Sequence, residues 1–252
     1  MRLIRPAYSR RVTGPVVLAL LMLIVGCAAL VVMAVLPEGN NAPIGLLGLS
    51  GALGLGVGAA MAVRAFGAAR QLTQQRGDDL ARMLTAAFDD AYVLILSPRL
   101  PGVPDDLAGL LVGPAGVRVL VARRWHGRYR VRSRSWEFDT RSRAKWIPCV
   151  TNPSFDVDKV TAAVSHWARE AADGASLPFV GAIAFPRRYS KVVLEEPEVD
   201  VVTLDNAPWW AQRIGRIQRM DPPRVARFVE AVLDASERPA DERVGATSPR
   251  TA

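Results

Sequence analysis

The sequence predicts an N-terminal transmembrane helical hairpin followed by one α/β (α+β) domain with a mixed sheet. Two apolar runs, residues 16–36 and 43–63, contain almost no polar side chains. At a rise of about 1.5 Å per residue, each run is long enough to cross a hydrocarbon core of about 30 Å. Beyond them, short apolar runs typical of strands alternate with amphipathic segments typical of helices, and this alternation predicts the α/β domain.

The charges around the two apolar runs predict how the chain crosses the membrane. Residues 1–15 and the linker at 64–76 are basic, whereas the external loop at 37–42 contains no Lys or Arg. Positively charged flanks stay in the cytoplasm, so both the N- and the C-terminus are expected there. The chain is therefore expected to be a multi-pass protein of a bacterial plasma (inner) membrane, with the lipid bilayer as one partner.

Two features of the anchor leave alternatives open. Residues 24–27 resemble a bacterial lipobox, which would make Cys27 a lipidated N-terminus, but the apolar run continues for nine residues beyond it. A buried helix residue is therefore the favoured interpretation of Cys27. In the second run, Gly54 and Gly58 form a GxxxG pattern, which favours close packing against the first span and allows a homo-oligomer.

The pattern from residue 77 to residue 235 predicts each element of the domain in turn. Leu80, Met83 and Leu84 recur at helical spacing and predict a helix from 77 to 88. The strands are expected at 92–96, 107–112, 117–121, 128–134, 179–185 and 199–204, with a Gly113–Gly116 turn between the second and third. Further helices are expected at 156–172 and 222–235. The polar segment at 236–252 is expected to be a disordered tail.

Composition supports a folded chain and excludes several classes of site. Half of the 252 residues are hydrophobic and 22% are charged, so the chain can bury a substantial apolar core. Two cysteines, Cys27 and Cys149, exclude a disulfide-rich scaffold and a cysteine-based zinc cluster. Two histidines, His126 and His166, leave no histidine-rich metal site, and no phosphate-binding loop is present. We therefore expect no bound metal and no cofactor.

The stretch at 107–127, which reads LAGLLVGPAGVRVLVARRWHG, carries a resemblance to a known family. It resembles the centre of the nuclease-related domain (NERD), most specifically in its VGPxGV turn and in the trailing Gly127. Trp136 and the Asn152-Pro153 pair add to the resemblance, which covers roughly residues 77–205. The resemblance implies a PD-(D/E)xK nuclease-like αβββαβ core and a metal-dependent nuclease activity.

The residues that carry out catalysis in that family are replaced in this chain. Where the family has Asp, Glu and Lys, this sequence has Ala108, Val121 and Arg123. Ala and Val offer no oxygen to a divalent cation, and Arg cannot release a proton at neutral pH. The domain is therefore expected to be catalytically inactive and to act in binding or scaffolding. The alternative is an active metal-dependent nuclease with a relocated site, in which Asp106 or Asp156 supplies the missing carboxylate.

A basic segment at 118–145 is the most distinctive charge feature of the chain. It contains ten cationic and two acidic residues, a net charge of +8 that equals that of the whole chain. Alternation over 128–134 would align four guanidinium groups on one face of a strand. The candidate binding residues are Arg124, Arg128, Arg130, Arg132, Arg134 and Lys145. Three interpretations remain open: a solubilising edge strand, contact with nucleic acid, or contact with anionic lipid headgroups.

Overall fold

The computed structural model describes residues 1–6, 77–140, 145–171 and 177–238. They form an α/β domain with two mixed sheets, and the predicted fold class is corrected in one respect. Within this part of the chain no helix is both long and apolar enough to cross a membrane. The predicted spans at 16–36 and 43–63, with Cys27 and the Gly54–Gly58 pattern, lie outside the described residues.

The physical reason for this correction is the polarity of the helices. The 19-residue helix α3 (Pro153–Ala171) is long enough to cross a bilayer, but it buries one face only and carries Asp156 and Arg169 in its first and last turns. The shorter helices α4 (Ala207–Gly215) and α5 (Pro222–Glu237) also have polar faces. No described helix therefore bears out the predicted transmembrane hairpin, multi-pass topology or inner-membrane localisation.

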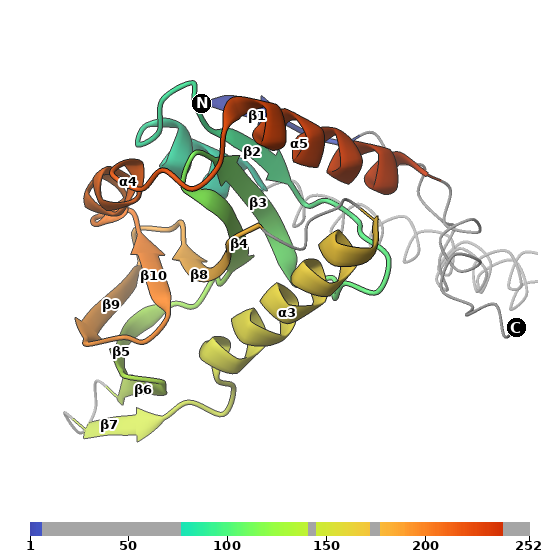
Figure 1. Cartoon of the computed structure of the whole chain (residues 1–252). Coiled ribbons are helices and arrows are strands. Elements are labelled where there is room, and N and C mark those ends of the chain that lie inside the picture. The colour runs from blue at the N-terminus through green and yellow to red at the C-terminus, as the bar shows by residue number, and fades with distance from the viewer. Residues whose placement is uncertain (7–76, 141–144, 172–176, 239–252) are drawn as a thin grey trace, which may run out of the picture. The chain divides into compact units, whose positions relative to one another are not determined.

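The larger sheet, sheet A, is six-stranded within the described residues (Figure 1). Its strands, in spatial order, are β1 (Arg2–Ile4), β2 (Val93–Leu96), β3 (Leu107–Gly113), β4 (Gly116–Ala122), β8 (Phe179–Phe185) and β10 (Asp200–Thr203). The β2–β3–β4 segment is an antiparallel meander, and β8 then pairs with β4 in parallel. Helix α3 makes the crossover between β4 and β8, as parallel strands require.

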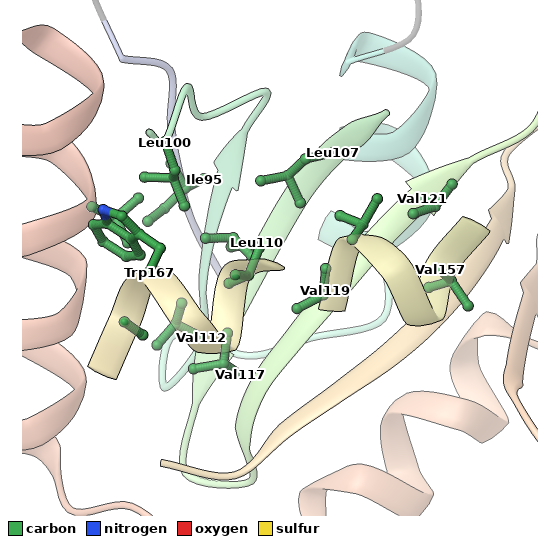
Figure 2. Close-up of a cluster of buried hydrophobic side chains, with 14 of the residues drawn as sticks. Ile95, Leu100, Leu107, Leu110, Val112, Val117, Val119, Val121, Val157 and Trp167 are labelled. Atoms are coloured by element: carbon green, nitrogen blue, oxygen red, sulfur yellow. The ribbon is translucent and has the colours of Figure 1, made fainter. Parts of the chain in front are cut away.

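Apolar side chains cover both faces of sheet A, so its central strands read as continuous hydrophobic runs. One face packs against α3 and α5, and Figure 2 shows part of this core, with Val119 and Val121 of β4 near Val157 of α3. The other face packs against α4 and a helical segment at 77–85. Sheet A is therefore the middle layer of three, with helices on either side.

The smaller sheet, sheet B, is four-stranded and contains the basic segment. Its order is β7 (Lys145–Pro148), β6 (Ser135–Thr140), β5 (Gly127–Arg132) and β9 (Ser190–Glu195). Val131 and Trp136 leave this sheet on the side of the α3 core, where both are buried. The strand β5 lies between β6 and β9, so the interpretation of the arginine strand as an edge strand is wrong.

Most elements predicted between residues 77 and 235 are present. The expected antiparallel strand pair is confirmed, with Gly113 opposite Gly116, and the expected helix at 156–172 is confirmed as α3, packed on that pair. The last helix continues to Glu237, so the expected tail begins too early, and residues 239–252 lie outside the described part. The strands β1, β6, β7 and β9 and the helix α4 were not predicted.

Candidate functional site

Charged residues gather at the edge of sheet A where β2, β4 and β8 end, here called the carboxyl edge. Arg123 and Arg124 directly follow β4, and Arg187 follows β8 two residues after its end. Asp106 directly precedes β3, which runs antiparallel to β4 and so begins at this edge. In open α/β sheets this edge is the usual place for a ligand site.

Arg123 forms ion pairs with two carboxylates at the carboxyl edge. Its Nη1 donates to Asp106 Oδ1 at 3.2 Å, and its Nη2 donates to Asp156 Oδ2 in the first turn of α3. The Arg123 side chain is only 18% exposed. The two carboxylates that sequence reasoning considered as replacements for the missing nuclease residues therefore converge, but they converge on a guanidinium group.

The residues at the three family positions do not converge. Val121 is 0% exposed and faces α3 among the core side chains of Figure 2. Ala108 lies at an irregularity in the β3–β4 pairing, between Leu107 and Gly109, and packs against the core on the opposite face of sheet A. Restoring carboxylates at these two positions would place them on opposite faces of the sheet.

The residues present do not fit a divalent cation. Calcium and magnesium are held by several oxygen ligands, and a permanently charged guanidinium beside two carboxylates repels a cation from the same place. Within the described ranges, no group of three or more His, Cys, Asp or Glu side chains is placed to hold a metal ion.

A second cluster at the carboxyl edge is centred on Asp79, in the first turns of the helical segment at 77–85. Its carboxylate is contacted by Arg82 at 2.5 Å, Arg187 at 2.8 Å and Arg124 at 3.2 Å. Burial alone would raise the pKa of Asp79, but hydrogen bonds and charge from Arg187, Arg82 and Arg124 outweigh burial and lower that pKa. The carboxylate of Asp79 thus contacts three guanidinium groups. This cluster was not predicted from the sequence.

The candidate binding arginines of β5 share one face of sheet B, as the alternation predicts, but each contacts a carboxylate. Arg128 lies 3.7 Å from Asp139, and Arg130 donates to Glu137 through Nε at 2.8 Å. Arg132 contacts Glu195 at 2.8 Å. Arg128 and Arg132 nevertheless expose 58% and 66% of their side chains. These carboxylates belong to the neighbouring strands β6 and β9.

The aromatic residues of sheet B divide between core and surface. Trp136 is buried and donates from Nε1 to Ser154 Oγ at 2.8 Å. Trp146 of β7 lies instead beneath the guanidinium groups of Arg128 and Arg130, whose Cζ atoms are 5.6 and 4.7 Å from its ring centre. The alternation of the basic segment does not predict this position of Trp146, because the residue belongs to another strand.

The remaining candidates lie outside the row on β5. Arg134 lies in the turn between β5 and β6, its guanidinium lies over the ring of Phe155, and it forms an ion pair with Asp158. Arg124 belongs to the Asp79 cluster at the carboxyl edge. Lys145 begins β7, is exposed, and accepts a hydrogen bond on its carbonyl from Thr140. The structure therefore separates the six candidates into four places: the row on β5, the turn after it, the carboxyl edge and the start of β7.

Comparisons of the chain with known protein families, with curated proteins and with solved structures give no match.

Proposed function

We propose that this chain is a nuclease-related domain that binds nucleic acid without cleaving it. The observation that carries the proposal is the position of Arg123 between Asp106 and Asp156. In a nuclease of the kind that the sequence resembles, carboxylates at such a place would hold a divalent cation. Here a guanidinium neutralises them instead.

The exposed face of sheet B supports a single-stranded ligand. Phosphate groups pair well with guanidinium groups, and bases stack on aromatic rings with little sequence preference. Arg128, Arg132 and Trp146 supply both kinds of contact on one face. The guanidinium groups of Arg128 and Arg132 are the exposed side of their ion pairs, because the partner carboxylates of Asp139 and Glu195 are less exposed. A phosphate can therefore contact the outer side of each guanidinium while the carboxylate stays in place.

The test uses the full chain with a fluorescein-labelled 30-nucleotide single strand, followed by anisotropy and by gel analysis. We expect binding that weakens as salt rises, because each phosphate contact releases counterions. We expect no cleavage with Mg²⁺ or Mn²⁺ present. The double variant Arg128→Gln/Arg132→Gln should weaken binding about tenfold or more at low salt. It should also reduce the slope of log affinity against log salt concentration by about 1.4 for the two lost phosphate contacts.

The control variant is Arg227→Gln, which removes an exposed arginine from α5. Helix α5 packs against sheet A, whereas β5 belongs to sheet B. This variant should leave the affinity within about twofold. Equal losses in the two variants would show only a response to net charge and would contradict the assignment to sheet B. Cleavage that disappears on Asp106→Asn or Asp156→Asn would instead establish the alternative, a nuclease with a relocated site.

A further inference from the structure

A groove of about 600 Å³ lies between α5 and the β1 side of sheet A. None of the residues that line it belongs to sheet B. Figure 1 shows α5 lying alongside β1 and β2. The groove is lined by apolar side chains from the sheet and from one stripe of α5: Ile4, Val93, Val225, Ala226, Val229 and Leu233. Its size and lining fall within the range of binding grooves for small ligands and peptide segments.

An acidic rim borders this apolar lining. Glu230, Asp234 and Glu237 recur at positions i, i+4 and i+7 of α5, so they follow one line along the helix beside the groove. Within the described part of the chain, no ion pair engages these three side chains, whereas the carboxylates of sheet B and the carboxyl edge contact arginines. In a chain of net charge +8, this is a locally negative surface.

Two further charged residues line the groove, and one of them is neutralised. Asp90 accepts from the N-terminal ammonium group of Met1 at 2.8 Å, and the same contact lowers the pKa of Asp90. Arg2 of β1 also lines the groove. With Asp90 paired, the three α5 carboxylates outweigh Arg2, and the rim favours a cationic partner.

Among the described residues, no strand pairs with the outer edge of β1, the strand beside the groove. Within the described residues β1 pairs with β2 alone and ends sheet A. Edge strands of this kind accept an added strand from another chain, and side chains that alternate along the added strand then enter the adjacent groove. Arg2 and Ile4 are the β1 residues that line this groove, and Leu3 between them does not.

We propose that the groove binds a short peptide segment of a partner protein as an added strand beside β1, and that every second residue of this segment faces the groove and is alternately apolar and basic. The apolar side chains would pack on Val225, Val229 and Leu233. The basic side chains, about 13.6 Å apart along an extended strand, would reach Glu230 and Glu237 at the two ends of the acidic row, about 10.5 Å apart along the helix. The proposal is independent of the nucleic-acid function, because it uses none of the same residues.

The test measures binding of the fluorescein-labelled octapeptide Val-Ser-Lys-Ser-Val-Ser-Lys-Ser, whose Val and Lys side chains share one face of an extended strand, to the full chain by anisotropy. The control peptide has Glu in place of Lys and should not bind. The variants Glu230→Gln, Asp234→Asn and Glu237→Gln should each weaken Val–Lys binding roughly two- to fivefold, as expected for exposed ion pairs. The matched control Glu170→Gln, an exposed carboxylate on α3, should leave the affinity unchanged.

A second variant separates docking in the groove from attraction to surface charge. Ala226 is exposed on α5, so Ala226→Trp fills the groove without displacing a core side chain. It should abolish peptide binding and leave the thermal midpoint unchanged. Binding that survives Ala226→Trp, that is equal for both peptides, or that weakens equally in Glu170→Gln would overturn the proposal, as would the absence of binding to the native chain.

Discussion

Asp79 illustrates how a single residue can organise one end of the sheet. Its side chain is 12% exposed and contacts Arg82, Arg124 and Arg187, which come from three separate segments of the chain. Removing the carboxylate would leave these guanidinium groups close together with less compensating charge. The cluster therefore links the helical segment at 77–85 to the ends of β4 and β8.

Replacing this carboxylate should change stability in a pH-dependent way. The folded-state pKa of Asp79 is lowered, so its contribution is complete above its unfolded pKa of about 3.9 and is lost as the pH falls through the folded value. At pH 7, Asp79→Asn should cost roughly 1.5–3 kcal/mol in the free energy of unfolding. The difference from the native chain should shrink below about pH 4.

Urea denaturation at pH 7, 5, 4 and 3 measures this difference. The control is Asp105→Asn, an exposed carboxylate outside the cluster, which should change the free energy of unfolding by less than about 0.5 kcal/mol. A difference between the Asp79→Asn and native chains that stays constant with pH would show that the carboxylate does not stabilise the fold through its charge.

Among the elements, the β3–β4 hairpin depends most on local backbone geometry. Gly113 and Gly116 pair across the turn, and Gly116 has a positive φ of 106°. A Cβ at Gly116 would lie 2.6 Å from the carbonyl oxygen and from Cγ of Pro178, just before β8. The turn therefore needs glycine both for its dihedral angle and for the approach of the neighbouring strand.

Alanine substitution can separate these two requirements. Gly127 also has a positive φ, of 121°, but a Cβ there would meet nothing within 4 Å. Gly127→Ala should therefore cost only the backbone strain, about 1–3 kcal/mol. Gly116→Ala should cost more, because strain and overlap with Pro178 add. Thermal unfolding of the two variants compares them, and equal midpoints would show that the β4–β8 approach is not tight.

At the scale of the described molecule, Trp136 connects the two sheets. It belongs to sheet B, is 3% exposed, and its ring lies 5.7 Å from that of Phe185 in sheet A. Its Nε1 also donates to Ser154 at the start of α3. We therefore expect both sheets to unfold together in one transition.

Substitution of Trp136 tests this connection. Trp136→Ala should cost about 3–5 kcal/mol, whereas Trp136→Phe should cost about 1–3 kcal/mol because it leaves the buried Ser154 hydroxyl without its donor. Trp209→Phe is the control, since Trp209 is 61% exposed. Urea unfolding followed by circular dichroism and by fluorescence should give coincident curves in each case. Two separate transitions would show that sheet B folds independently.

The sequence by itself determined the elements whose signals are local. Apolar spacing predicts α3 and α5, and the Gly113–Gly116 segment between two apolar runs predicts the β3–β4 hairpin, all of which are present. The strands β6, β7 and β9 escaped prediction because they are short, half-polar and stabilised by their neighbours in sheet B.

Only the tertiary structure decided what the charged residues do. The basic segment at 118–145 has few acidic residues of its own, yet Arg130 and Arg132 contact Glu195, and Arg123 contacts Asp156. Asp79 and Arg187 meet although 108 positions separate them. Charge counted along a sequence omits such partners, because electrostatic attraction depends on distance in space, and the pairing of β5 with β9 and of α3 with β4 sets that distance.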